Sequence, residues 1–255
     1  MACQWYISRV FFSAGRIMDL LEVHHLARST HQGAKLHAQL EGRLFRVSAG
    51  VVTLHTDQGM WVVPPGYMAW VPPMQLHLPV SHGDMRGLRL NFAEAWSRGQ
   101  MPAQPRVIRQ SQLLVSLLDE MPLDPSLNTI YLQVFADAFA RKPAQDLFLP
   151  VPQDERLRQI TQGLFYKPDS DADLDDWVEI IGMPRRTLTR RFQKETGLSF
   201  AQWRQQLRLM LAMEQLAAGE PVAEVAPRVG YQSVSAFIQV FRRALGETPK
   251  SMFAA

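Results

Sequence analysis

Residues 230–245 read GYQSVSAFIQVFRRAL, and residues 182–197 read GMPRRTLTRRFQKETG. Both stretches begin with a glycine that permits a tight turn, and both continue with the periodicity of a helix that has one apolar stripe and one basic face. The two stretches are therefore two copies of one pattern. Two such helices, held apart by a third, have the arrangement needed to enter successive major grooves of one DNA duplex.

Helical periodicity extends on both sides of these stretches. Seven helices are expected, over residues 154–165, 174–181, 184–196, 200–218, 222–229 and 233–245, with a short one from Pro249. Asp173 and Ser233 stand where a side-chain oxygen caps the helix that follows. Residues at helical spacing are expected to pack the helices together: Trp177, Ile180, Leu188 and Phe192 in the first pair, Val222, Val225, Val229, Phe237 and Phe241 in the second, and Trp203, Leu207, Met210, Leu211, Glu214 and Leu216 between them.

The motifs RRTLTRRF, WRQQLRL, VAEVA and GYQSVSAFIQVFRRALGETP follow one another in this segment. In these residues, their order and their spacing, the chain resembles the AraC/XylS family of transcriptional regulators. The resemblance implies a DNA-binding domain with two helix-turn-helix motifs, whose recognition helices contact major-groove segments about one helical turn apart. Two prolines depart from the family's pattern. Pro184 replaces a common capping serine, and Pro227 removes one backbone donor from the first helix of the second motif.

Positive charge is concentrated in the same segment. The chain carries a formal net charge of +3, with 27 Lys/Arg and 24 Asp/Glu. Eleven of these Lys/Arg and eight of the Asp/Glu lie between Leu174 and Ala255, so residues 1–173 are balanced. Because cationic side chains neutralise phosphates and release counterions, a polyanion is expected to bind this part of the chain.

Position along each recognition helix predicts which side chains meet bases and which meet phosphates. Residues near the start of the helix, opposite the packed stripe, face the floor of the groove, where arginine donates two hydrogen bonds to guanine. Base contacts are expected from Arg185, Arg186, Thr189, Arg190, Val234, Ser235, Ile238 and Gln239, and phosphate contacts from Arg191, Lys194, Arg242 and Arg243. The alternative for each arginine is a solvated side chain or a pair with Glu195 or Glu247.

The first part of the chain has a different pattern of apolar residues and turns. Between Leu26 and Phe92, short runs such as RLFRVSAG, VVTLHT, MWVVPP, MAWVPP and LRLNF alternate with Gly, Pro and Asp turns, which is typical of a β-sandwich or barrel. Residues 109–141 then predict two helices joined by a turn at Pro122–Pro125. Their apolar stripes are Leu113, Leu114, Leu117, Leu118 and Met121, and Ile130, Val134, Phe135, Ala138 and Phe139. The following segment PAQDLFLPVPQDERL is interpreted as a linker.

Residues 66–77, GYMAWVPPMQLH, resemble the second motif of the cupin barrel, with Met74 in place of a usual glycine. In that frame Gly50 closes the first motif. The metal-ligand positions of the cupin pattern then fall on His37, Gln39, Arg43 and His77. A cupin metal site needs about three imidazoles and a carboxylate, whereas this chain keeps two imidazoles and adds a guanidinium that cannot ligate. We therefore expect no metal, and interpret the histidines as hydrogen-bonding groups of a barrel cavity or as satisfied core residues.

The expected fold is α+β in three parts. Residues 1–96 form a cupin-like β-barrel for sensing or dimerisation, of which residues 1–17 are an extension outside the fold. Residues 97–150 form a helical hairpin and linker, and residues 151–255 form an all-α DNA-binding domain of the AraC type with two helix-turn-helix motifs.

This architecture favours a sequence-specific transcriptional regulator whose barrel responds to a small molecule. The alternative is a metal-dependent cupin enzyme that carries a DNA-binding tail, and the incomplete ligand set argues against it. No Ser/His/Asp, phosphate-loop or paired-carboxylate constellation predicts another chemistry, so we expect neither enzyme activity nor a cofactor. A third interpretation makes the barrel a dimerisation scaffold without an effector.

Location and partners follow from the same reasoning. The single cysteine, Cys3, allows no internal disulfide, which fits a reducing cytoplasm. No apolar run reaches the ~18 residues that cross a bilayer, so no membrane partner is expected. The expected partners are double-stranded promoter or operator DNA, a small-molecule effector and RNA polymerase. The helical hairpin has more apolar surface than one sheet face needs, so it is expected either to dock between the domains or to pair two chains as a homodimer.

Overall fold

The computed structural model describes residues 21–26, 35–120 and 125–254. The chain forms two compact units, each of which has its own core. The first unit contains the described residues up to Thr56 together with Val63–Asp146, and the second contains Asp57–Val62 and the residues from Leu147. The extension predicted at residues 1–17 and most of the predicted turn at Pro122–Pro125 lie outside the described residues.

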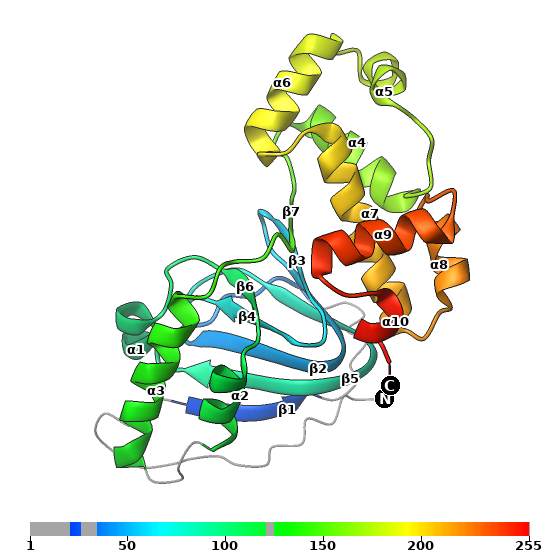
Figure 1. Cartoon of the computed structure of the whole chain (residues 1–255). Coiled ribbons are helices and arrows are strands. Elements are labelled where there is room, and N and C mark those ends of the chain that lie inside the picture. Colours follow the sequence, from blue (N-terminus) through cyan, green and yellow to red (C-terminus); the bar gives the residue numbers. More distant parts are fainter. Residues whose placement is uncertain (1–20, 27–34, 121–124, 255) are drawn as a thin grey trace. The chain divides into compact units, whose positions relative to one another are not determined.

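An antiparallel sheet forms the centre of the first unit (Figure 1). Its strands lie in the order β1 (Leu21–Leu26), β5 (Leu78–Phe92), β2 (Gly42–His55), β4 (Tyr67–Val71) and β6 (Arg106–Arg109). Register shifts on either side of Ala49 bend the long β2–β5 pair, and the sheet curls.

Two runs that were expected to be separate strands, RLFRVSAG and VVTLHT, are parts of the single strand β2. Gly50 lies between them with φ of 70°. Only glycine adopts this conformation without strain, and here it forms a bulge inside a strand where a turn was expected. Met74, at the position where the cupin motif has a glycine, also has a positive φ of 64°.

Three helices cover one face of the sheet (Figure 1): α1 (Glu94–Gln100), α2 (Gln112–Asp119) and α3 (Pro125–Ala140). Alternate residues of the strands point toward these helices, because successive side chains of a strand face opposite sides. Strand and helix residues share one apolar core, which contains Leu44, Met68, Trp70, Leu90, Phe92, Met101, Ile108, Leu114, Leu132, Phe135, Ala136 and Phe139. The opposite face of the sheet carries polar residues, which are described below.

The helical hairpin α2–α3 buries only part of its predicted apolar stripes. Leu114 and Phe135 are fully buried against the sheet, whereas Leu113 is 54% exposed, Ile130 61% and Val134 44%. These three exposed residues agree with the expectation that the hairpin has more apolar surface than one sheet face needs. Each stripe is wider than the sheet face that it covers, so one side of the hairpin stays apolar and exposed.

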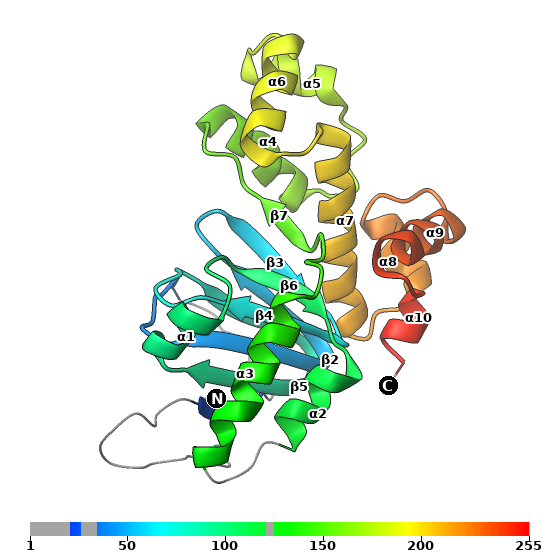
Figure 2. The same ribbon diagram turned by 60° about the vertical axis from the view of Figure 1, so that its left-hand side comes forward.

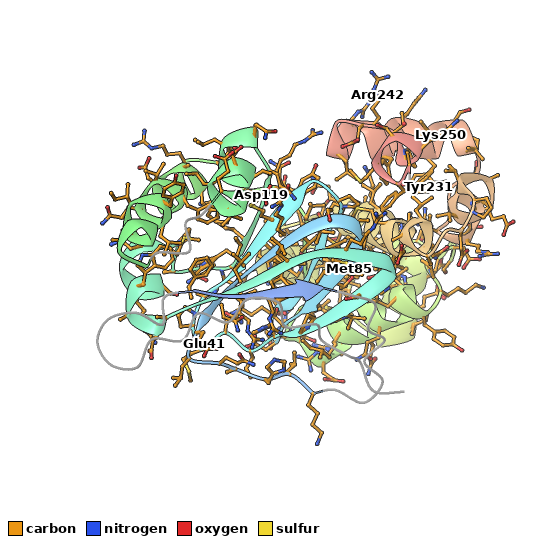
Figure 3. The ribbon with its side chains drawn as sticks, turned by 90° about the horizontal axis from the view of Figure 1, so that it is seen from below. Glu41, Met85, Asp119, Tyr231, Arg242 and Lys250 are labelled. Carbon is orange, nitrogen blue, oxygen red and sulfur yellow. The ribbon has the colours of Figure 1, made fainter. Side chains whose placement is uncertain are left out.

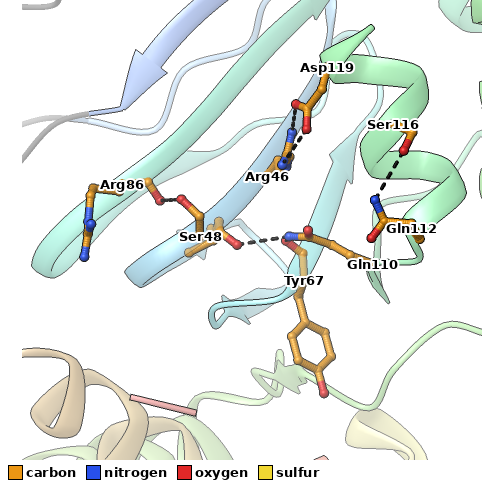
Figure 4. A network of polar contacts seen from close by, with 9 residues as sticks. Arg46, Ser48, Tyr67, Arg86, Gln110, Gln112, Ser116 and Asp119 are labelled. Atoms are coloured by element: carbon orange, nitrogen blue, oxygen red, sulfur yellow. Dashed lines mark hydrogen bonds and ion pairs between the residues drawn. The ribbon is translucent and has the colours of Figure 1, made fainter. Parts of the chain in front are cut away.

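Directional polar contacts attach this hairpin to the sheet (Figure 4). The side-chain amide of Gln110, just before α2, donates to the carbonyl oxygens of Val47 (3.0 Å) and Tyr67 (2.9 Å). At the other end of α2, Asp119 forms an ion pair with Arg46 of β2. Because buried carbonyls need donors, the amide of Gln110 fixes the start of α2 more tightly than apolar contact alone.

Helices make up most of the second unit (Figure 2). They are α4 (Glu155–Tyr166), α5 (Leu174–Ile181), α6 (Arg185–Thr196), α7 (Phe200–Ala217), α8 (Val222–Arg228), α9 (Val234–Leu245) and α10 (Pro249–Met252). The predicted bounds of α4 to α9 agree with these to within one residue. Within the described parts of the chain, no helix combines the length and the hydrophobicity that crossing a bilayer requires.

The long helix α7 is the centre of this unit. Trp203, Leu207 and Met210 are buried, as predicted, and the ring of Trp203 lies edge-on to the ring of Phe192 from α6, with centroids 5.9 Å apart. Leu211 and Glu214 of the predicted spine are only half-buried.

The packing predicted for α5 was wrong at Ile180, which is 66% exposed. Trp177 of the same helix packs so closely on α4 that a Cβ at Gly163 would lie 2.6 Å from its ring. This contact sets the rotation of α5, and Ile180 remains on its outer side.

A pair of antiparallel strands, here called the ribbon, also belongs to the second unit, apart from Val63 at its end. Strand β3 (Gly59–Val63) pairs antiparallel with β7 (Phe148–Pro150), and the rings of Trp61 and Phe148 lie 4.6 Å apart. The interpretation of this region as a plain linker was wrong at residues 148–150. Leu149 is fully buried, and the backbone of β7 is paired on β3, so the segment has a fixed conformation.

Side chains of α7 attach the ribbon to the helices. The indole nitrogen Nε1 of Trp203 donates to the carbonyl oxygen of Pro150 at 2.7 Å, and Nε2 of Gln206 donates to that of Phe148 at 2.6 Å. These oxygens point away from β3, so the two side chains satisfy acceptors that the ribbon itself leaves unpaired.

Gly59 allows the two strands of the ribbon to approach each other. Its φ is 151°, and a Cβ there would collide with the carbonyl oxygen of Leu149. We expect Gly59→Ala to lower the free energy of unfolding by about 2–4 kcal/mol, because it adds a backbone clash to the strain of a positive φ. Urea unfolding measures the change. Gly66→Ala is the control, since Gly66 has φ of 82° but no atom within 4 Å of its Cβ position, and should cost only about 1 kcal/mol. Equal costs would contradict the clash.

Candidate functional site

The first helix pair of the second unit, α5 and α6, is shaped by its turn. Gly182 ends α5 with φ of 61°, a left-handed conformation typical of glycine after a helix. Pro184 then occupies the N-cap of α6, as expected for a residue that replaces a capping serine, and forms no capping hydrogen bond. Leu188 and Phe192, four residues apart, are fully buried and set the rotation of α6 about its axis. The other side of α6 therefore faces solvent.

That exposed side of α6 carries the residues predicted to meet bases. The side chains of Arg185, Arg186, Thr189 and Arg190 are all exposed, and so are those of Arg191 and Lys194 further along. Within the described part of the chain, Arg186 and Arg190 form no ion pair. Their guanidinium groups are therefore available for a ligand that carries hydrogen-bond acceptors and negative charge.

Two other arginines of α6 have partners within the second unit. Arg185 forms an exposed ion pair with Asp175 in the first turn of α5. Arg191 donates from Nη1 to Oδ2 of Asp154, the N-cap of α4, at 2.8 Å. Glu195, predicted as an alternative partner for arginine, instead accepts from the backbone N–H of Asp154 at 2.9 Å. The sequence signal for these pairs was the presence of acidic residues at the starts of helices. Sequence reasoning did not use this signal.

Asp154 is itself stabilised as a carboxylate. Partial burial would raise its pKa, but the hydrogen bond from the Arg156 backbone N–H and the Arg191 guanidinium lower the pKa overall. A phosphate that engages Arg191 must compete with this pair, so Arg191 is a weaker candidate for DNA contact than Arg186 or Arg190.

The second pair, α8 and α9, repeats the arrangement. Gly230 lies in the turn with φ of 86°, and the Ser233 side chain caps α9 by accepting from the Ala236 N–H. Phe237 and Phe241 are fully buried on one side of α9. On the other side Ser235 and Gln239 are exposed, whereas Val234 and Ile238 are half-buried.

The end of α9 carries the remaining positive charge. Arg242 and Arg243 lie in its last turn and are exposed. In Figure 3 the side chain of Arg242 points away from the helix into solvent. The side of α9 opposite Phe237 and Phe241 thus offers a hydroxyl, an amide and apolar groups, while the positive charge lies at the end of the helix.

A cluster of polar side chains lies on the face of the sheet that the helices leave uncovered. Arg43 of β2 is 5% exposed, and its Nη1 lies 3.4 Å from Nε2 of His37 and 3.3 Å from Nε2 of His77. The imidazole centroids are 5.1 Å apart, and the two histidines pair through both backbone N–H groups. Three of the four predicted pocket residues therefore meet. Gln39 contributes its carbonyl oxygen, which accepts from the Met74 N–H at 2.7 Å.

Sequence reasoning missed two residues of the same face, Arg89 and Asn91 of β5. Their Cα partners on β2 are Phe45 and Arg43, respectively, so they share the face of Arg43. The signal was present in the run LRLNF, where Arg89 and Asn91 alternate with Leu88, Leu90 and Phe92 at the period of a strand.

His77 is a neutral imidazole in this cluster. Its Nδ1 lies 2.8 Å from the carbonyl oxygen of Gln75, so Nδ1 carries the proton and Nε2 accepts from Arg43. Its pKa is lowered from 6.5 to about 4, chiefly by burial and also by the positive charge of Arg43, although the hydrogen bond to Gln75 acts in the opposite direction.

These residues do not fit a divalent metal ion. Both Nε2 atoms, the only ring nitrogens left for coordination, receive the guanidinium of Arg43. Among the described residues, no three His, Cys, Asp or Glu side chains are placed to share a metal. The guanidinium of Arg43 thus lies between the two imidazoles, where a metal ion would need further ligands.

Comparisons with known proteins agree with the helical part of the structure. The family model "Helix-turn-helix domain" matches residues 177–255, which include α6 to α10. The HTH-type transcriptional regulator NimR of Escherichia coli strain K12 is 32% identical over 220 residues, which span 84% of this chain and 80% of NimR. The HTH-type transcriptional regulator RipA of Corynebacterium glutamicum is 36% identical over 102 residues, 40% of this chain and 31% of RipA.

Solved structures include the DNA-binding domain of AdpA, a global transcriptional factor, in complex with a target DNA. It is 31% identical to this chain with a TM-score of 0.36, and the match covers 38% of this chain and 87% of that domain.

The lowered pKa of His77 predicts a pH-dependent stability. The unfolded chain binds a proton on this imidazole near pH 6.5, whereas the folded chain does so only near pH 4. Stability is therefore lost as the pH falls through this window, by about 1–3 kcal/mol between about pH 7 and pH 4.5. Urea unfolding at both pH values should show this loss in wild type and in His55→Gln, which changes an exposed imidazole of β2, but not in His77→Gln. An equal loss in His77→Gln would show that other groups cause it.

Proposed function

Because the chain belongs to the AraC/XylS family of transcriptional regulators, we propose that α6 and α9 are its two recognition helices. The chain is a DNA-binding transcription regulator, and the proposal concerns how it recognises DNA. One observation carries it: the buried Leu188 and Phe192 turn the basic side of α6 to solvent, with Arg186 and Arg190 unengaged within the described residues. The equivalent side of α9 is exposed by the burial of Phe237 and Phe241.

The two helices divide the work of recognition differently. On α6, Arg186 and Arg190 donate to guanine edges and Thr189 contacts a thymine methyl or a base acceptor, while Arg185 leaves Asp175 to join them. On α9, Gln239 is the one bidentate group, supported by Ser235 and by contacts of Val234 and Ile238 with methyl groups. Lys194, Arg242 and Arg243, together with Arg191 when it leaves Asp154, bind phosphates and set the register.

The curled sheet is the regulatory part of the proposal. We assign it to the cupin type on the positions of Gly50, Met74, His37 and His77, and expect a small-molecule effector on the polar face around Arg43. Effector binding would alter operator binding or the contact with RNA polymerase on the promoter. The enzyme alternative is disfavoured, because Arg43 takes the coordinating nitrogens of both histidines and the relatives are regulators. We therefore expect the regulator to be located in the cytoplasm, where its target DNA lies.

A second copy of the chain is the proposed occupant of the exposed side of the helical hairpin. Ile130 and Val134 lie one turn apart on α3, with Leu113 exposed on α2. Apolar side chains that stand together on a helix pair are the usual core of a homodimer interface. The proposed regulator is therefore a homodimer with double-stranded operator DNA as its main partner.

Removal of Arg186 should change specificity, and removal of Arg242 should change affinity alone. Arg186→Ala loses a bidentate contact worth about 1–3 kcal/mol and flattens the preference at one base position. Arg242→Ala weakens binding to operator and random DNA equally and lowers the salt slope by about one unit. Titrations on both DNAs at several salt concentrations measure both effects, with an operator selected from random duplexes by the wild-type protein.

Arg228→Ala is the control for both variants, since Arg228 lies on α8 and pairs with Glu220 and Glu224. It should leave specificity and the salt slope unchanged. If Arg186→Ala lowered both affinities equally and kept the ranking of base-substituted operators, the placement of α6 in the groove would be wrong.

The dimer is tested by charging its proposed surface. Wild type should sediment as a dimer at tens of micromolar, and the double variant Ile130→Lys, Val134→Lys as a monomer, because burying two ammonium groups costs more than the interface gains. Leu40→Lys changes an apolar side chain that is 62% exposed outside the hairpin and should leave the dimer intact. A wild-type protein that stays monomeric with and without operator DNA removes the dimer from the proposal.

A further inference from the structure

Arg208, in the middle of α7, reaches two segments that are far apart in the sequence. Its Nε donates to the carbonyl oxygen of Pro168 at 3.0 Å, and its Nη2 donates to that of Ser170 at 3.3 Å. Its Nη1 donates to the carbonyl oxygen of Gly230 at 2.8 Å. One half-buried guanidinium thus joins the loop after α4 to the turn between α8 and α9.

Each of these segments leads directly into one helix pair. The loop continues through Ala172, whose carbonyl accepts from Nη1 of Arg204 at 3.0 Å, to Asp173, the N-cap of α5. Gly230 lies three residues before Ser233, the N-cap of α9. Arg208 therefore fixes the start of the first pair and the start of the second recognition helix to the same point of α7.

The site is built for a guanidinium. Gly230 has φ of 86°, and a Cβ at this position would collide with the guanidinium of Arg208. Three carbonyl acceptors in different directions match the planar fork of arginine, whereas a lysine ammonium offers one point charge on a flexible stem. Burial lowers the pKa of Arg208, yet an arginine remains charged at neutral pH, so the bonds to all three carbonyls are charge-assisted.

Each helix pair also has apolar contacts that do not involve Arg208. The ring of Phe192 on α6 packs against Phe200 and Trp203 near the start of α7, with centroids 5.8 and 5.9 Å away. In the second pair, Phe237 and Phe241 pack against each other at 5.7 Å. Without Arg208 both pairs keep these cores, but the polar tie between them is lost.

We propose that Arg208 is a positioning residue that sets the orientation of one recognition helix relative to the other. The inference rests on the proposed function, in which α6 and α9 bind one duplex together. Once the first recognition helix is bound, the second one meets its target at a high effective concentration. This holds only when the distance between the two targets on the DNA matches the distance between the two helices. A tie that fixes their orientation makes affinity depend sharply on that spacing, because each added base pair moves the second target by about 3.4 Å and turns it by about 35°.

The test uses the full chain and a duplex that the wild-type protein selects from a random pool, with base pairs added or removed between its two halves. Wild type should lose about tenfold or more in affinity for a change of one base pair. Arg208→Met should bind the best duplex about tenfold more weakly and lose at most about threefold for the same change. Arg208→Lys should behave like Arg208→Met, because it keeps the charge without the fork.

Arg204→Met is the matched control. It removes an arginine one turn away on α7 and a bond to the same loop, but leaves the link to Gly230, so the steep dependence on spacing should persist. Circular dichroism checks that each variant is folded. If Arg208→Met does not fold, the spacing dependence of Arg208→Lys tests the positioning role instead.

The outcomes separate the two proposals. A steep dependence in wild type that remains equally steep in both Arg208 variants overturns the positioning role and leaves the proposed function intact. If wild type selects no duplex, or its affinity is independent of spacing, the proposed function fails and the positioning role fails with it. A flat dependence in Arg204→Met as well as in the Arg208 variants also overturns the inference, because the link to Gly230 would then be irrelevant.

Discussion

Burial against α7 is the constraint on which the helices of the second unit depend. Helix α5 has eight residues and α8 has seven, and isolated helices shorter than ~12 residues are marginal in water. Their stability must come from side chains packed on a longer element. The buried residues of α7, which include Trp203, Leu207 and Met213, are distributed over most of its length and supply that surface to both helix pairs. Caps at Asp173 and Ser233 start the short helices but do not replace this burial.

The same packing determines which charged side chains are free. Because Leu188 and Phe192 are buried, every arginine of α6 projects from the exposed side. Acidic residues at the starts of α4 and α5 then engage some of them, such as Arg191 with Asp154. Such exposed pairs contribute little stability, so DNA phosphates displace them at low cost. The arginines of α6 therefore differ from one another although their charge is the same. Within the described residues Arg186 and Arg190 form no ion pair, so the DNA contacts proposed for them require no partner to be displaced.

The helices were predictable from the sequence because their signals are local: a glycine turn, a cap and apolar residues at a spacing of three or four. The sequence predicted that the first unit is built of β-strands, but it did not predict where each strand begins and ends. A bulge at Gly50 and a turn have the same local sequence. Contacts between distant segments were not predictable. Nothing in the run LRLM shows that Arg208 meets Gly230, and the proline-rich residues 148–150 pair with a strand almost ninety positions earlier. In the candidate site, exposure of the predicted α6 residues followed from the helical period, whereas the ion pairs of Arg185 and Arg191 depend on tertiary placement.

The ribbon of β3 and β7 joins two segments that are far apart in the sequence. Its strands are separated by residues 64–147, nearly all of which belong to the first unit, so their pairing closes a long loop. Closing such a loop costs chain entropy, and the cost is smaller once the intervening residues are already folded. The three-residue β7 has too few backbone bonds to form alone, so it also needs the donors that Trp203 and Gln206 provide from α7. The ribbon therefore depends on two supports, namely the folded residues between its strands and the side chains of α7.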